Sequence, residues 1–401
     1  MMEKKNAPAI RFSEFTDEWK EQKFSRLYEP NNERNSGEFT FEKTISIASM
    51  TYNKKGNGAD ISSLSNYKVL RMGDIAYEGH TNKEFRYGRF VLNDLGDGIM
   101  SPRFTSLRPI AMQDFSFWKY YIHSEKVMRS KLVYATKAGT MMNELVYDDL
   151  AKLSIAVPSI DEQQKIGDFL ENLDSFISSH QDRYEKLQSI KKAMLEKMFP
   201  HDGASVPEVR FNGFAGEWTL KKMDDVVSPY LDPVPTPHDG YWRLGIRSHA
   251  KGVFHDYVKP GMELETAKMH RVAANNFIVN ITFGWEHAVA ITSEEDAGML
   301  VSHRFPQFSF NQDMVPEFFN YVIADEKFRR HLELASPSGA GRNRVLNIPQ
   351  MLEYKMYVPS RPEQERIAGF FLELDSLISL QQQRLEKLKN IKAACLEGMF
   401  V

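Results

Sequence analysis

A long internal repeat constrains this sequence more than any other feature. Residues 157–199 align without a gap onto residues 358–400 at an offset of 201, and 24 of the 43 aligned positions are identical. A second match near the front of each half pairs Pro8 to Trp19 with Pro207 to Trp218 at an offset of 199. A period of half the chain predicts two units of one fold rather than one large domain.

Similarity between the two halves is uneven. Residues from about 25 to 100 and from about 224 to 300 resemble each other poorly, whereas the ends of the halves match well. Duplicated supports with divergent bodies indicate two variable modules that do the same task on different targets. Residues that both halves share, such as Arg103 and Arg304, are then better suited to scaffolding or phosphate contact than to discrimination.

The two repeated segments are predicted to be long helices. Their apolar residues recur at spacings of three and four, which is typical of a coiled-coil seam. About 40 residues at 1.5 Å rise make a rod of roughly 60 Å, and each copy is the nearest available partner for the other. The predicted helix-pair interface is Ile166, Phe169, Leu173, Phe176, His180, Leu187 and Ile190, with Ile367, Phe370, Leu374, Leu377, Gln381, Leu388 and Ile391.

One polar residue interrupts each seam at equivalent places, His180 in the first copy and Gln381 in the second. Antiparallel pairing about a pseudo-two-fold axis would bring these residues into one central polar layer that fixes the register. Parallel pairing would also stack them, but only antiparallel pairing sends the two modules to opposite ends. The alternative for both residues is a position that simply faces solvent.

The bodies mix short strand-like runs, such as Phe277 to Ile281, with amphipathic segments, such as Phe117 to Leu132. The predicted fold class is therefore α+β, with two similar globular domains separated by two long antiparallel coiled-coil helices in a pseudo-two-fold internal repeat. The helices are expected at 156–200 and 357–401, and the globular domains at 1–155 and 201–356.

Composition narrows the functional classes. Cys395 is the only cysteine, which excludes disulfide frameworks and thiolate zinc clusters. No run approaches the roughly 18 apolar residues of a membrane span, and Met1 to Asn6 is charged, so a cytoplasmic location without membrane contact is expected. The formal net charge of -3 means that any phosphate-binding surface must be local.

Motifs for catalysis are missing from the sequence. It contains no Walker A motif and no Pro-Pro dipeptide of the kind that adenine methyltransferases use in their Asn/Asp-Pro-Pro-aromatic loop. Gly96-Asp97-Gly98 and Gly339-Ala340-Gly341 lack the strand and helix context of a cofactor loop and are better interpreted as turns. The prediction is a chain with no catalytic residue, no metal and no cofactor of its own.

Four basic clusters inside the modules are candidates for DNA contact, because Lys and Arg neutralise phosphates while Arg and Asn make bidentate contacts with guanine and adenine. Each could equally be a solvated turn. The candidates are Lys54, Lys55 and Asn57, then Arg86, Tyr87 and Arg89, then Arg243, Arg247 and Lys251, and finally Arg342, Asn343 and Arg344.

Together these features resemble one protein family. The Pro-Ser-x-x-Glu-Gln opening of each long helix at Pro158 and Pro359, the Met-Phe ending at Phe199 and Phe400, and the variable bodies between them are similar to the specificity subunits of type I restriction-modification systems. The resemblance implies a non-catalytic chain that binds double-stranded DNA, in which 1–155 and 201–356 are target-recognition domains for the two halves of a bipartite site.

The resemblance also implies partners. Two modification subunits would methylate adenine and two restriction subunits would translocate and cleave DNA, so that S-adenosylmethionine, ATP and Mg are used by the partner subunits. The rods would set the distance between the two readers. Two other classes remain open from the residues alone, namely a self-sufficient nuclease or methyltransferase and a coiled-coil scaffold that joins two protein-binding modules.

Overall fold

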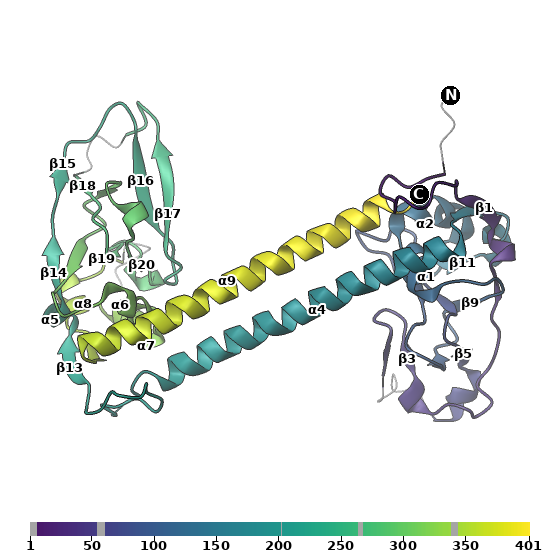
Figure 1. The fold of residues 1–401 in the computed structure, drawn as a ribbon, viewed down its shortest axis with the longest axis horizontal. Helices are drawn as coiled ribbons and strands as arrows, with labels where there is room; N and C mark the ends of the chain where they lie inside the picture. The colour runs from purple at the N-terminus through teal and green to yellow at the C-terminus, as the bar shows by residue number, and fades with distance from the viewer. Residues whose placement is uncertain (1–5, 54–60, 202, 264–267, 338–343) are drawn as a thin grey trace. The chain divides into compact units, whose positions relative to one another are not determined.

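The computed structural model describes residues 6–53, 61–201, 203–263, 268–337 and 344–401 (Figure 1). The chain divides into two compact units, each described here by itself. Unit 1 comprises Met1–Arg183 with Gln381–Val401, and unit 2 comprises Tyr184–Leu380. Each unit therefore contains a mixed helix and strand body together with parts of both long helices.

Unit 1 is built around a four-stranded antiparallel sheet in the order β2-β9-β6-β7, with four two-stranded pairs beside it. The sheet strands are β2 Tyr28–Pro30, β9 Thr105–Pro109, β6 Ile75–Glu78 and β7 Arg89–Leu92. The pairs are β1 Lys20–Lys23 with β12 Ser154–Val157, β3 Ile45–Ser46 with β4 Thr51–Tyr52, β5 Lys68–Leu70 with β8 Gly98–Met100, and β10 Thr136–Lys137 with β11 Glu144–Leu145. The body helices are α1 Phe115–Tyr121, α2 Glu125–Ala135 and α3 Tyr147–Leu150.

Unit 2 has a matching four-stranded antiparallel sheet in the order β14-β22-β19-β20 and a five-stranded sheet in the order β15-β18-β21-β16-β17. The first contains β14 Val227–Tyr230, β22 Gln307–Phe310, β19 Asn276–Val279 and β20 Val289–Ile291. The second contains β15 Pro233–Val234, β18 Met269–Arg271, β21 Leu300–Ser302, β16 Tyr241–Ile246 and β17 Val253–Val258. A further pair joins β13 Thr219–Lys222 to β23 Lys355–Val358, and the helices are α5 Met223–Val226, α6 Pro316–Ile323, α7 Glu326–Leu334 and α8 Ile348–Leu352.

The two bodies share one framework and differ in one region. The central sheets have the same strand order, and the helix pair α1 and α2 corresponds to α6 and α7. The difference lies in the segments that the sequence showed to diverge, where unit 1 has the short pairs β3-β4 and β5-β8 and unit 2 has the five-stranded sheet. Figure 1 shows that sheet at the end of unit 2 away from α5, α6 and α8. The α+β fold with a duplicated body is as predicted.

The two long helices are continuous. Helix α4 spans Ile160–Lys197 and helix α9 spans Arg361–Gly398, each with 38 residues. Pro158 and Pro359 stand just before them, where proline ends the preceding strand without breaking helical hydrogen bonds. The predicted segments 156–200 and 357–401 enclose these helices.

Buried polar side chains at the start of each helix attach it to its body. Glu162 is 2% exposed and accepts hydrogen bonds from Arg11 at 2.7 and 2.8 Å, while the indole of Trp118 donates to the Gln163 side chain at 3.0 Å. The Glu-Gln pair of the repeated motif is therefore a structural anchor.

The second copy repeats this anchor. Arg210 donates to Glu363 at 2.6 and 2.7 Å, and the Val315 backbone N–H donates to the Gln364 side chain at 2.9 Å. Because a buried carboxylate without its partner is expensive, removing either arginine is expected to cost about 3–5 kcal/mol.

The buried stripe of each helix follows a strict four-three spacing, as in a heptad repeat. Its buried and half-buried residues on α4 and just after it are Ile166, Leu170, Leu173, Ile177, His180, Tyr184, Leu187, Lys191, Met194 and Met198. On α9 and just after it they are Ile367, Phe371, Leu374, Ile378, Gln381, Leu385, Leu388, Lys392, Cys395 and Met399. Each seam position on α9 lies 201 residues after a seam position on α4, so the spacing of the seam is duplicated.

Six predicted interface residues were placed wrongly. Phe176, Leu377, Ile190 and Ile391 are 57%, 43%, 37% and 38% exposed, and Phe169 and Phe370 pack instead on Phe12 and Phe211 of the N-terminal segments. Each lies one residue before a seam position. The prediction favoured apolar residues over Lys191 and Lys392, whose ammonium groups reach aspartates on the other helix while the lysines themselves stay half-buried.

Contacts inside each unit show that the helices pair antiparallel. In unit 1, Asp174 of α4 accepts from Lys392, and six residues later His180 Nδ1 lies 2.7 Å from the Gln381 side-chain oxygen. Positions rise on α4 as they fall on α9. The meeting of His180 with Gln381 is as predicted from antiparallel pairing, and Gln381 is 9% exposed.

Unit 2 repeats the ionic contact. Lys191 of α4 donates to Asp375 of α9, and the Tyr321 hydroxyl of α6 donates to the same carboxylate at 3.2 Å. In unit 1 the Tyr120 hydroxyl of α1 donates to Asp174 at 2.6 Å. Each body therefore contacts the helix pair through an equivalent tyrosine, and burial beside the carboxylate raises the pKa of both phenols.

We expect the contact between His180 and Gln381 to specify the register of the helix pair and to add little to the free energy of unfolding. Replacing His180→Leu alone strands the buried Gln381 amide and is expected to lower the free energy of unfolding by about 1–3 kcal/mol. The double variant His180→Leu with Gln381→Leu should recover this loss, because neither position then leaves a buried polar group without a partner. Urea unfolding of the full chain measures both, and a double variant less stable than the single one would contradict the assignment.

Candidate nucleic-acid interface

Three segments meet in unit 2 around the turn that joins β19 to β20. The first is the tip of the β16-β17 hairpin, the second is the β19-β20 turn itself, and the third is the segment after α7. The backbone N–H groups of His249 and Ala250 donate to the carbonyls of Glu286 and His287, both at 2.9 Å, and the Ser248 hydroxyl donates to the Glu286 carboxylate at 2.7 Å. His249, Ala250 and His287 all have positive φ, at 63°, 51° and 61°. Three non-glycine residues in this strained region indicate a closely specified junction.

The third segment follows α7. The Leu346 backbone N–H donates to the Ile281 carbonyl at 2.8 Å, and the Arg344 guanidinium lies 5.5 Å from the centre of the Trp285 ring. The β16-β17 tip, the β19-β20 turn and the segment after α7 therefore form one surface of unit 2.

Unit 1 assembles the corresponding three segments. Arg89 donates to the Ala48 carbonyl in the β3-β4 tip at 3.0 Å and to the Glu78 carboxylate at 2.8 Å. The Asn143 backbone N–H in the segment after α2 donates to the Gly79 carbonyl at 3.0 Å. Among the described candidates, Arg89 of unit 1 and Arg344 of unit 2 therefore lie at corresponding junctions, each beside the turn of the central sheet.

The predicted residues in unit 1 have different surroundings. Arg86 is exposed, whereas Tyr87 is half-buried and its carbonyl accepts from the Tyr77 hydroxyl at 2.6 Å. Arg89 is committed to Glu78 and Ala48 and lies over the Phe85 ring at 5.1 Å. Of this cluster, Arg86 has the side chain most available for a ligand.

In unit 2, Lys251 is exposed at the hairpin tip. Arg243 pairs with Asp256 at 2.6 Å, and Arg247 donates to the Val253 carbonyl and lies 5.4 Å from the Phe254 ring centre. The remaining candidates, Lys54, Lys55, Asn57, Arg342 and Asn343, lie outside the described residues.

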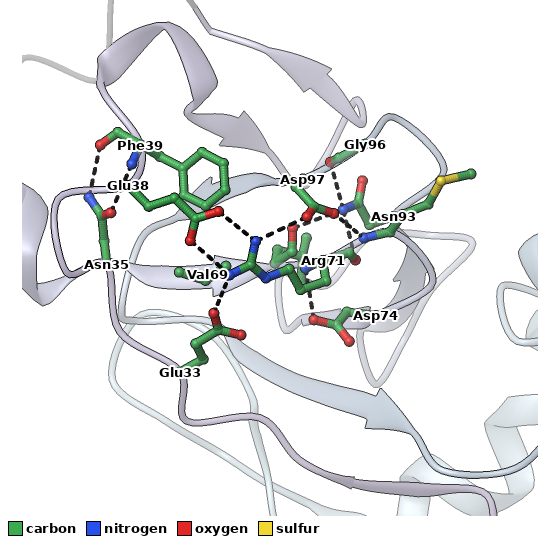
Figure 2. A network of polar contacts seen from close by, with 12 residues as sticks. Glu33, Asn35, Glu38, Phe39, Val69, Arg71, Asp74, Asn93, Gly96 and Asp97 are labelled. Atoms are coloured by element: carbon green, nitrogen blue, oxygen red, sulfur yellow. Dashed lines mark hydrogen bonds and ion pairs between the residues drawn. The ribbon is translucent and has the colours of Figure 1, made fainter.

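The divergent part of unit 1 contains an ionic network that the sequence did not reveal (Figure 2). Arg71 pairs with Glu33 at 2.5 Å, Glu38 at 2.8 Å and Asp97 at 3.0 Å. Arg108 pairs with Glu33 at 2.8 Å and with the buried Asp74 at 3.0 Å. These two arginines join segments far apart in the chain, and only their contacts in space could have identified them.

Electrostatics in this network follow from its geometry. The Arg71 guanidinium lowers the pKa of the Glu33 carboxyl, and the Met72 backbone N–H together with Arg71 lowers the pKa of Asp97. Burial raises the pKa of Asp74 despite its bond to Arg108. Both arginines are thus occupied by carboxylates and are structural rather than available to phosphates.

In the part of the chain that the structure describes, no cluster of three or more His, Cys, Asp or Glu side chains could hold a metal ion. The buried His287 bonds to the Ile323 carbonyl at 2.6 Å, and burial lowers its pKa, which suits a neutral structural imidazole. Among the described helices, none has the length and apolar character needed to cross a membrane.

Comparison with known proteins gives the class. The family model described as "Type I restriction modification DNA specificity domain" matches residues 35–189 and 250–390, once in each half. The chain belongs to this family, the specificity subunits of type I restriction-modification systems, which are non-catalytic.

Individual relatives agree with this class. The MjaVIII specificity subunit of Methanocaldococcus jannaschii is 22% identical over 68% of this chain and 67% of its own length. The HindI specificity subunit of Haemophilus influenzae is 29% identical over 33% of this chain and 29% of its own length. The crystal structure of the type I S subunit from M. genitalium matches 98% of this chain and 99% of its own, with 13% identity and a TM-score of 0.56, and so shares the fold.

The Arg71 network should make unit 1 sensitive to acid. Because the folded pKa values of Glu33 and Asp97 lie below their unfolded values, their contribution to stability is present above the unfolded pKa and is lost as the pH falls through the folded pKa. Arg71→Gln should therefore be less stable than the parent at pH 7, and the gap should narrow toward pH 3. Urea unfolding across this range, with the exposed Arg26→Gln as control, measures it. A gap that stays constant with pH would contradict the assignment.

Proposed function

We propose that this chain recognises a bipartite site in double-stranded DNA, with one half-site for each unit. The observation that carries the proposal is a shared framework combined with a different β subdomain in each unit. A common framework suits a common task, and the divergent sheets supply surfaces for two different base sequences. The surface formed by the hairpin tip, the turn of the central sheet and the segment after α2 or α7 is the proposed DNA interface.

The proposed contacts are those of the four basic clusters. Among the described residues, Arg86, Arg243, Lys251 and Arg344 are the candidates for direct contact, whereas Tyr87, Arg89 and Arg247 would hold the surface in place. Lys54, Lys55, Asn57, Arg342 and Asn343 extend the same proposal to the adjoining segments. The net charge of -3 leaves little general attraction for DNA, so neighbouring subunits would supply part of it.

The proposed assembly contains two modification subunits and two restriction subunits, positioned on the DNA by this chain in the cytoplasm. The repeated helices support two copies of one partner, because 24 of their 43 aligned positions are identical and each half can offer like side chains. S-adenosylmethionine, ATP and Mg would be bound by those subunits and not by this chain.

Mapping of methylated adenines tests the proposal. A host that carries this chain with its modification subunits should methylate one bipartite motif, and deletion of this chain alone should abolish that motif. Exchanging residues 20–155 for another module of the family should change one half-site and leave the other intact. Methylation that survives deletion, or an exchange that alters both half-sites, would reject the proposal.

The length of the helices is proposed to set the spacer between half-sites. Inserting seven residues at equivalent points of α4 and α9 keeps the four-three seam in phase and adds about 10 Å of helix. At 3.4 Å per base pair, the methylated motif should gain about three unspecified positions while both half-sites stay unchanged. The same insertion in α4 alone, which breaks the pairing, is the control. An unaltered spacer in the double insertion would refute the ruler.

A further inference from the structure

The five-stranded sheet of unit 2 places two exposed arginines on one face. Arg271 of β18 is paired in register with Leu300 of β21, and Leu300 is paired in register with Arg243 of β16. Residues directly opposite each other on neighbouring strands project from the same face. Two strand spacings separate the arginine backbones by roughly 10 Å.

Each of these arginines has one aspartate beside it. Arg243 lies 2.6 Å from Asp256 and Arg271 lies 3.8 Å from Asp232, and the arginine side chains are 44% and 55% exposed. Exposed pairs of this kind contribute about 0–1 kcal/mol, so either guanidinium can turn to a ligand at little cost. Arg71 and Arg108, by contrast, are each held by two or more carboxylates.

We propose that Arg243 and Arg271 determine the base specificity of unit 2, each with its aspartate reading one G·C pair in the major groove. This inference rests on the proposed function and adds the residues and bases to it. An arginine matches the O6 and N7 acceptors of guanine, and an aspartate accepts from the N4 amino group of cytosine. An Arg-Asp pair has no net charge and gains little from a phosphate, whereas a G·C edge offers both acceptors and a donor.

The spacing and shape of the sheet face support this assignment. The distance of roughly 10 Å between the two arginine backbones corresponds to about three base-pair steps of 3.4 Å. The two G·C pairs are therefore expected about three positions apart. A hollow of about 650 Å³, lined by residues that include Tyr241, Trp242, Arg271 and Leu300, opens beside the second arginine and leaves room for a base edge.

The position of the pairs favours DNA over a protein partner. No five-stranded sheet occurs among the described residues of unit 1, so this face has no equivalent there. A partner that binds both units alike requires a surface that both possess. A surface found in one unit suits the ligand that must differ between them, which is the half-site sequence.

The experiment uses the full chain assembled with its modification subunits and a DNA library in which the unit 2 half-site is randomised. The variants are Arg243→Ala, Arg271→Ala, Arg243→Lys and Arg271→Lys, with the exposed Arg330→Ala of α7 as the control. Each alanine variant should reduce discrimination for guanine at one position by roughly 5- to 150-fold, at two positions about three apart. The lysine variants should also lose discrimination, because lysine keeps the charge and not the bidentate geometry.

The outcomes separate the possibilities. An even fall in methylation across all sequences, rescued by lysine, would mean phosphate contact and overturn the inference. Weaker co-purification of the modification subunits would mean a protein interface and overturn it as well, as would an unchanged motif. If the complex with the parent chain methylates no defined motif, the proposed function is wrong and this inference is wrong with it.

Discussion

The structure depends on how each long helix begins. A buried carboxylate at Glu162 or Glu363, clamped by an arginine from the N-terminal segment of the same half, fixes the first turn of the helix to the body. The adjacent glutamine bonds to backbone and indole groups, so the helix direction relative to its body is set by several bonds at once. Without this junction the body could rotate about the first turn of its helix.

Within each unit, the heptad seam fixes the register between α4 and α9. Its polar positions are few and specific: the His180 and Gln381 layer, and the two Lys-Asp contacts that recur at the offset of 201. An apolar seam alone could slide by a heptad, whereas a misplaced lysine or amide would be left without its partner. The register is therefore specified by polar groups, and the apolar residues provide most of the burial.

Sequence patterns predicted the duplicated architecture and the long helices, because these follow from repetition and periodicity along the chain. Antiparallel pairing, with the contact between His180 and Gln381, was preferred because it sends the two modules to opposite ends, and the structure contains that contact. The exact seam was partly wrong. Phe176 and Ile177 are both apolar, so composition does not separate them, and Ile190 is more apolar than Lys191, yet Phe176 and Ile190 lie on the exposed flank. The Arg71 and Arg108 network and the Arg271 position were missed altogether. Each depends on residues that strand pairing brings together, and strand order cannot be read from local pattern.

The charged side chains of the two divergent regions are arranged differently. In unit 1 four carboxylates hold Arg71 and Arg108 in place. In unit 2 Arg243 and Arg271 of the divergent sheet each have a single aspartate in an exposed ion pair. A near-neutral chain can thus present local groups for base edges without a general basic surface. If the proposed base contacts hold, such a surface would discriminate by matching donors and acceptors, since specificity is a difference between affinities and gains little from binding every sequence tightly.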